Sequence, residues 1–87
     1  MKWQNTMQIP ITMPELGTLR AELSVWFVDV GARVEEGERL LEILAGAATV
    51  DIAAPATGRL VRQCALPPDS VLPGQVLGYI ENHIGTS

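Results

Sequence analysis

The sequence predicts a small all-β domain, a sandwich or a barrel, and three observations support this prediction. Short segments alternate apolar and polar residues with the period of two that is typical of half-buried strands. Gly and Pro clusters that form turns separate these segments at close intervals. The second half of the chain also repeats the first at a fixed offset. The 87 residues have room for one such domain and for no second core.

The first two predicted strands each have one apolar face. In the first strand this face consists of Met7, Ile9, Ile11 and Met13. Pro10 lies on the opposite face and donates no hydrogen bond, so we expect this strand at a sheet edge. The apolar face of the second strand consists of Leu19, Ala21, Leu23, Val25 and Phe27. Trp26 then falls on the outer face, where we expect it to cover part of the domain.

Residues 39–44 form the third predicted strand. An amphipathic helix over 35–44 competes with it, but Gly37 and the short length of the stretch disfavour a helix. The remaining predicted strands are 48–52, 60–66 and 76–80. Cys64 lies in one of them, and we expect it to be buried as a small apolar side chain.

An internal repeat relates the two halves of the chain at an offset of 37 residues. Five identities occur without a gap, namely Leu23/Leu60, Val34/Val71, Gly37/Gly74, Leu40/Leu77 and Ile43/Ile80. In each half a Val packs inward, a Gly permits a tight turn and a Leu begins the next strand. Two such halves can pair around a pseudo-twofold axis and bury one shared core. The repeat therefore predicts that Val34 and Val71 are both buried.

Composition argues against several classes of function. The net charge is −4, with ten acidic residues and six basic ones, so we expect no nucleic-acid partner. No apolar run is long enough to span a membrane and no secretory signal is visible, so we expect a cytoplasmic protein without a membrane partner. The single cysteine allows neither an internal disulfide nor a multi-cysteine metal site.

Few residues are candidates for catalysis. His83 is the single histidine, and its place near the C-terminus is typical of a solvated tail residue. Nothing near His83 or Cys64 marks either of them as an activated nucleophile. The acidic residues within 35–38 are typical of a solvated turn rather than of an acid–base pair. We therefore expect no enzymatic activity, no metal and no cofactor.

A set of short motifs runs without a gap over most of 7–81. It consists of Met-Pro-Glu-Leu-Gly at 13–17, Trp-x-Val-x-x-Gly-x-x-Val-x-x-Gly at 26–37, and the segments 40–43, 48–58 and 74–80. This set resembles the biotinyl/lipoyl attachment domains of 2-oxoacid dehydrogenase complexes and biotin carboxylases. The resemblance implies a flattened barrel-sandwich of two four-stranded antiparallel sheets, also called a barrel-sandwich hybrid. We expect this domain over 7–82, between a flexible leader at 1–6 and a tail at 83–87.

The sequence departs from that family at the family's functional centre. There the hairpin between the two halves carries Glu-Thr-Asp-Lys-Ala, or a Lys between methionines, and the lysine accepts lipoate or biotin. The equivalent stretch here, which we name the tip, consists of Leu44, Ala45, Gly46, Ala47 and Ala48. Ala47 therefore stands at the lysine position and has no amine to acylate. Lys2, the only lysine of the chain, lies outside the matched hairpin.

We expect a non-catalytic lipoyl-like module that binds a protein partner or a second copy of itself. The tip is small, apolar and uncharged, and exposed patches of this kind often mark interfaces. A tight turn without a further role is the alternative for the tip itself. The initial Met and short leader favour a free-standing small protein.

Two alternatives for the whole chain stay open. One is a carrier or accessory domain of a 2-oxoacid dehydrogenase or biotin-dependent carboxylase complex, modified despite Ala47. The other is an adaptor-type lipoyl domain of a transport system. Such adaptors usually carry a helical hairpin between the two halves, whereas only the tip joins them here.

Overall fold

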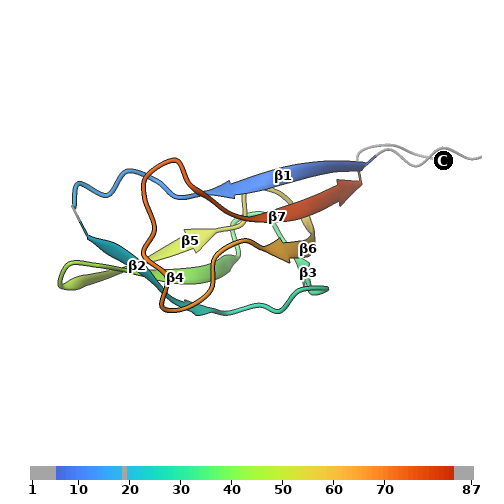
Figure 1. Ribbon diagram of the computed structural model, residues 1–87. Helices are drawn as coiled ribbons and strands as arrows, with labels where there is room; N and C mark the ends of the chain where they lie inside the picture. Colours follow the sequence, from blue (N-terminus) through green and yellow to red (C-terminus); the bar gives the residue numbers. More distant parts are fainter. Residues whose placement is uncertain (1–5, 19, 84–87) are drawn as a thin grey trace, which may run out of the picture.

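Two antiparallel sheets enclose one apolar core in the computed structural model, which describes residues 6–18 and 20–83 (Figure 1). One sheet has the strand order β1-β7-β6-β3 and the other has the order β2-β4-β5. The strands are β1 (Thr6–Thr12), β2 (Ala21–Trp26), β3 (Arg33–Val34), β4 (Arg39–Ala45), β5 (Ala48–Ala53), β6 (Gly58–Gln63) and β7 (Val76–His83). This all-β arrangement confirms the predicted barrel-sandwich. It also confirms a strand rather than a helix over 39–44.

The expected fourth strand of the second sheet is reduced to a single bridge. Glu22 of β2 pairs with Ser70 in an isolated antiparallel bridge. On either side, the Leu23 amide donates to the carbonyl of Asp69 at 2.9 Å, and the Val71 amide donates to the carbonyl of Ala21 at 3.0 Å. Residues 69–71 thus cover the outer edge of β2, although they are too few to form a regular strand.

The pseudo-twofold relation is visible in the turns. The Glu38 amide donates to the Glu35 carbonyl at 2.9 Å, and 37 residues later the Gln75 amide donates to the Leu72 carbonyl at 3.0 Å. In both turns the side chain of the last residue accepts a hydrogen bond from the amide of the first, at 3.0 Å in one turn and 2.9 Å in the other. The two halves therefore share their turn geometry as well as the identical positions.

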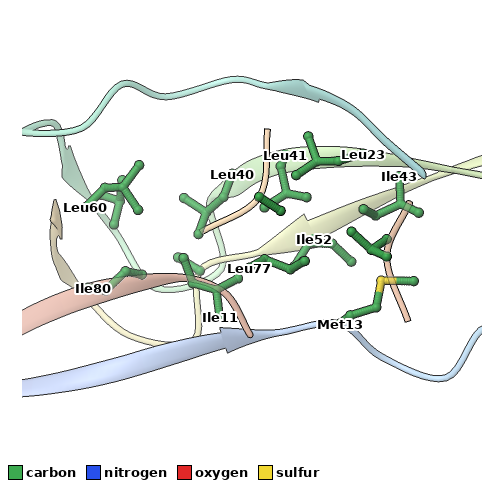
Figure 2. Packing of buried hydrophobic residues seen from close by; sticks show 14 residues of the cluster. Ile11, Met13, Leu23, Leu40, Leu41, Ile43, Ile52, Leu60, Leu77 and Ile80 are labelled. Atoms are coloured by element: carbon green, nitrogen blue, oxygen red, sulfur yellow. The ribbon is translucent and has the colours of Figure 1, made fainter. Parts of the chain in front are cut away.

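The core between the sheets is apolar (Figure 2). Its buried members are Ile11, Met13, Leu23, Val34, Leu40, Leu41, Ile43, Ile52, Ala54, Leu60, Ala65, Val71, Leu77 and Ile80. Val34 is 0% exposed and Val71 is 2% exposed, which confirms the burial predicted from the repeat. Both halves of the repeat therefore supply one continuous core.

A β-bulge in β2 changes which side chains face the core. The register with β4 shifts between Leu23 and Val25, so the alternation is interrupted there. As a result Val25 and Phe27 are exposed, and the prediction that they face inward was wrong. Trp26 is instead half-buried against the core, and its indole Nε1 donates to the carbonyl of Ala65 at 2.9 Å.

Two further side chains differ from the prediction. Met7 is 50% exposed because it lies near the outer end of β1, beyond the core. Cys64 is exposed, not buried, because β6 ends at Gln63 and the chain bends at the next residue. The predicted edge position of β1, based on Pro10, is confirmed by the strand order. Leu19 lies outside the described residues.

Candidate functional site

The tip is the turn of the β4–β5 hairpin and forms one end of the molecule (Figure 1). Ala45 ends β4 and pairs directly with Ala48, the first residue of β5, so the turn consists of Gly46 and Ala47 alone. Gly46 has a φ of +64°, and no other type of residue in the described ranges has a positive φ. A positive φ at the first central residue and a negative φ at the second are typical of a type II′ turn, which prefers Gly at its first central position.

The side chains of the tip are exposed and carry no charge. Leu44 is 37% exposed, and Gly46, Ala47 and Ala48 are also exposed. Ala45 is half-buried and packs against the core. Ala47 presents a methyl group to solvent, so the turn itself offers no nucleophile for acylation.

An open pocket of about 550 Å³ lies beside the tip. Its lining consists of Arg20, Ala21, Glu22, Leu44, Gly46, Ser70, Val71 and Leu72. The lining has one positive side chain, Arg20, and one negative side chain, Glu22, so it carries no net charge. Leu72, which is 67% exposed, and Leu44 add apolar surface. An apolar surface with a few polar groups suits contact with another protein.

A second pocket contains two arginines, and both have partners within the domain. It is lined by Arg33, Thr57, Gly58, Arg59, Glu81, Asn82 and His83. The guanidinium of Arg33 pairs with the carboxylate of Glu35 at 3.1 Å. The guanidinium of Arg59 donates to the carbonyl of Gly31. Both cations are therefore already engaged within the domain.

The candidate catalytic residues lie apart from one another. Cys64 follows β6, which ends beside Gly78 of β7, whereas His83 ends β7. At the usual strand rise, the five residues from Gly78 to His83 span roughly 17 Å. The carboxylates within 35–38 are exposed in their turn. Within 6–18 and 20–83, no group of three or more His, Cys, Asp or Glu is arranged to hold a metal ion.

The comparison with known families agrees with this geometry. A family model named Biotin_lipoyl, described as "Biotin-requiring enzyme", matches residues 9–80. The chain belongs to the biotinyl/lipoyl attachment domain family. Members are carrier-type domains, and the two antiparallel sheets and the β4–β5 hairpin are those expected of the family.

One curated relative is a component of an enzyme complex. It is the "Dihydrolipoyllysine-residue acetyltransferase component of acetoin cleaving system" of Bacillus subtilis (strain 168). The chain is 33% identical to it over 76 residues, which cover 85% of the chain and 19% of the relative. The chain therefore spans about a fifth of that relative's length. No helix among the described residues is long and apolar enough to cross a membrane.

The structure places all five predicted tip residues on one exposed turn or beside it. The role of the tip in binding stays a prediction. The sequence does not indicate the neighbours of the tip, above all Arg20 and Leu72, which line the same pocket. Leu72 reaches the pocket because the Glu22–Ser70 bridge holds residues 69–71 along β2. No local pattern in the sequence signals that bridge.

Proposed function

We propose that this domain is a non-acylated member of its family that acts as a protein-interaction module rather than as a carrier. The observation that supports this most directly is Ala47, which occupies the exposed turn where the family's hairpin carries its lysine. Attachment of lipoate or biotin through an amide needs a side-chain amine. The only lysine of the chain is Lys2, far from the hairpin in sequence.

The surface around the tip supports a binding role. Leu44 and Leu72 are both exposed and line the same pocket, so two large apolar side chains lie together at one end of the domain. Exposed apolar patches on small domains commonly mark contacts with other proteins. The charged residues of the family's hairpin are replaced by Leu44 and Gly46, which makes this end easier to desolvate.

Intact-mass measurement tests the absence of acylation. The full chain is co-expressed with lipoate ligase or biotin ligase and the matching cofactor, and we expect the unmodified mass. The matched control for lipoylation restores the family's Glu-Thr-Asp-Lys-Ala hairpin with Leu44→Glu, Ala45→Thr, Gly46→Asp and Ala47→Lys, and this variant should gain one lipoyl group. A wild-type chain that gains such a group would overturn the proposal.

A second candidate function follows from the relative, which is named as a component of an acetoin-cleaving system. In this case the domain would be an accessory part of such a complex and would bind its subunits without carrying an acyl group. Titration calorimetry with purified subunits of an acetoin-cleaving complex tests this function. We expect Leu44→Asp to weaken binding, whereas Leu66→Asp, an exposed leucine outside the tip and its pocket, should not.

A further inference from the structure

The two sheets have four outer edges, and three of them carry a feature that hinders pairing with another chain. β1 contains Pro10, β3 is only two residues long, and residues 69–71 cover β2. Proline, very short strands and covering segments are three of the ways in which proteins protect sheet edges, and charged side chains are another. The fourth edge is β5, and the described part of the chain shows none of the first three features there.

The backbone groups on the open edge of β5 follow from the hairpin. In a two-residue hairpin the residues flanking the turn form a hydrogen-bonded pair, and such pairs alternate with non-hydrogen-bonded ones. Ala48 and Val50 therefore bond to β4, whereas Thr49 and Asp51 direct their N–H and C=O groups away from it. These groups form a row that can accept another strand.

The pseudo-twofold relation shows that this edge is the unprotected counterpart of β1. Ala45 corresponds to Asn82 at the offset of 37, and their partners are Ala48 and Met7. Counting along both strands, Asp51 takes the place of Pro10. Because proline has no N–H, β1 cannot donate at this position, whereas β5 can.

The pattern of β5 is complementary to itself. If two copies meet antiparallel with Val50 opposite Val50, each Thr49 faces the Asp51 of the other copy. Both positions offer outward N–H and C=O groups, so each pair exchanges two backbone hydrogen bonds. On the core side, half-buried Val50 gains cover from its counterpart, and Ala48 meets Ile52. Apolar side chains thus meet on one face and polar ones on the other.

The charges on β5 itself do not oppose this contact, although each copy carries a net charge of −4. The carboxylate of Asp51 is bound by the guanidinium of Arg39 in the same chain at 3.2 Å. Asp51 also faces a threonine rather than the second Asp51, so like charges are not directly opposite. The small side chains of Ala47, just before β5, and of Ala53, its last residue, leave room for the second backbone.

We propose that the domain self-associates by pairing β5 with β5 of a second copy, which joins the two β2-β4-β5 sheets into one continuous sheet. This inference goes beyond the proposed function, because it names a second copy as a further partner and the edge of β5, rather than the tip and its pocket, as the surface. A contact made by one short strand buries less area than a standard stable dimer. The association is therefore weak and depends on concentration.

Light scattering after size-exclusion chromatography tests the pairing on the full chain. We expect a dimer fraction that rises over roughly 10 µM to 1 mM, the range of weak complexes. Asp51→Pro should stay monomeric because it removes an outward N–H, as Pro10 does in β1. Asp51→Ala is the matched control, since it loses the same bond to Arg39 but keeps the N–H, and it should still dimerise. Leu44→Asp should also dimerise.

Cross-linking gives a second readout in case Asp51→Pro fails to fold. In the background Cys64→Ser and with a mild thiol oxidant added, Val50→Cys should form a disulfide-linked dimer, because residues in a non-hydrogen-bonded pair lie about 4.5 Å apart between Cα atoms. Thr49→Cys lies off the axis and should cross-link far less. The inference is overturned if the wild-type chain is monomeric at every concentration or if Asp51→Pro dimerises. It is also overturned if Val50→Cys and Thr49→Cys cross-link equally. If the chain is unmodified by mass but stays monomeric, only this inference fails. If the chain is acylated but dimerises, only the proposed function fails.

Discussion

Truncation of Val34 and Val71 tests whether the two halves of the repeat stabilise one core to the same degree. Val34 is 0% exposed and Val71 is 2% exposed, so almost the whole of each side chain is removed from water. Val→Ala deletes two buried carbons at about 0.8 kcal/mol each, which gives roughly 1.6 kcal/mol. The void that remains adds to this loss, so we expect about 2 to 3 kcal/mol for each substitution.

Urea unfolding followed by circular dichroism measures this loss. Both variants should lower the free energy of unfolding by a similar amount with an unchanged m-value, and each kcal/mol should lower Tm by roughly 4–8 °C. Val30→Ala is the control, since Val30 is 55% exposed and should change stability by less than about 0.5 kcal/mol. A loss below about 0.5 kcal/mol at either buried valine would refute the shared core.

Three further substitutions probe specific contacts. Gly78→Ala would place a Cβ 2.5 Å from a carbonyl oxygen of β6 and 3.2 Å from Cη2 of Trp26, so we expect a loss of about 2 kcal/mol or more in urea unfolding; a neutral variant would contradict this packing. Trp26→Phe removes the hydrogen bond to Ala65, and its unfolding free energy should fall by about 1 kcal/mol or more. Glu38→Ala and Gln75→Ala each remove one side-chain bond of the repeated turns, so thermal unfolding should show similar losses of roughly 0.5–1 kcal/mol. Clearly unequal losses would show that the turns differ energetically.

Much of the fold could be predicted because the sequence carries one local pattern, the alternation of apolar and polar residues, and one long-range pattern, the repeat at an offset of 37. Alternation gave the strands, and the repeat gave the long-range relation that buries Val34 with Val71. The failures at Val25 and Phe27 have one cause. Alternation assumes an unbroken ladder, whereas the bulge in β2 appears only when the strand is paired with β4.

The candidate site was predicted less completely than the fold. The resemblance to the family's hairpin correctly indicated an exposed turn, which the structure forms at Gly46 and Ala47. The pocket beside it depends on the bridge that brings Leu72 along β2, and the open edge depends on the strand order that leaves β5 outermost. Both are properties of pairing between distant segments, and a local pattern does not encode them.

The pseudo-twofold relation also bears on how the chain is threaded. β7 and β1 pair from His83 and Thr6 onward, and they are the counterpart of the β4–β5 hairpin with its turn left out. A circular permutant could therefore begin at Ala47 and end at Gly46, with a two-residue turn joining Asn82 to Met7. Every strand would keep its neighbours, and the β1–β7 ladder would keep its register from the Met7–Asn82 pair onward. In this fold the tip and the two ends of the domain are interchangeable places for opening the chain.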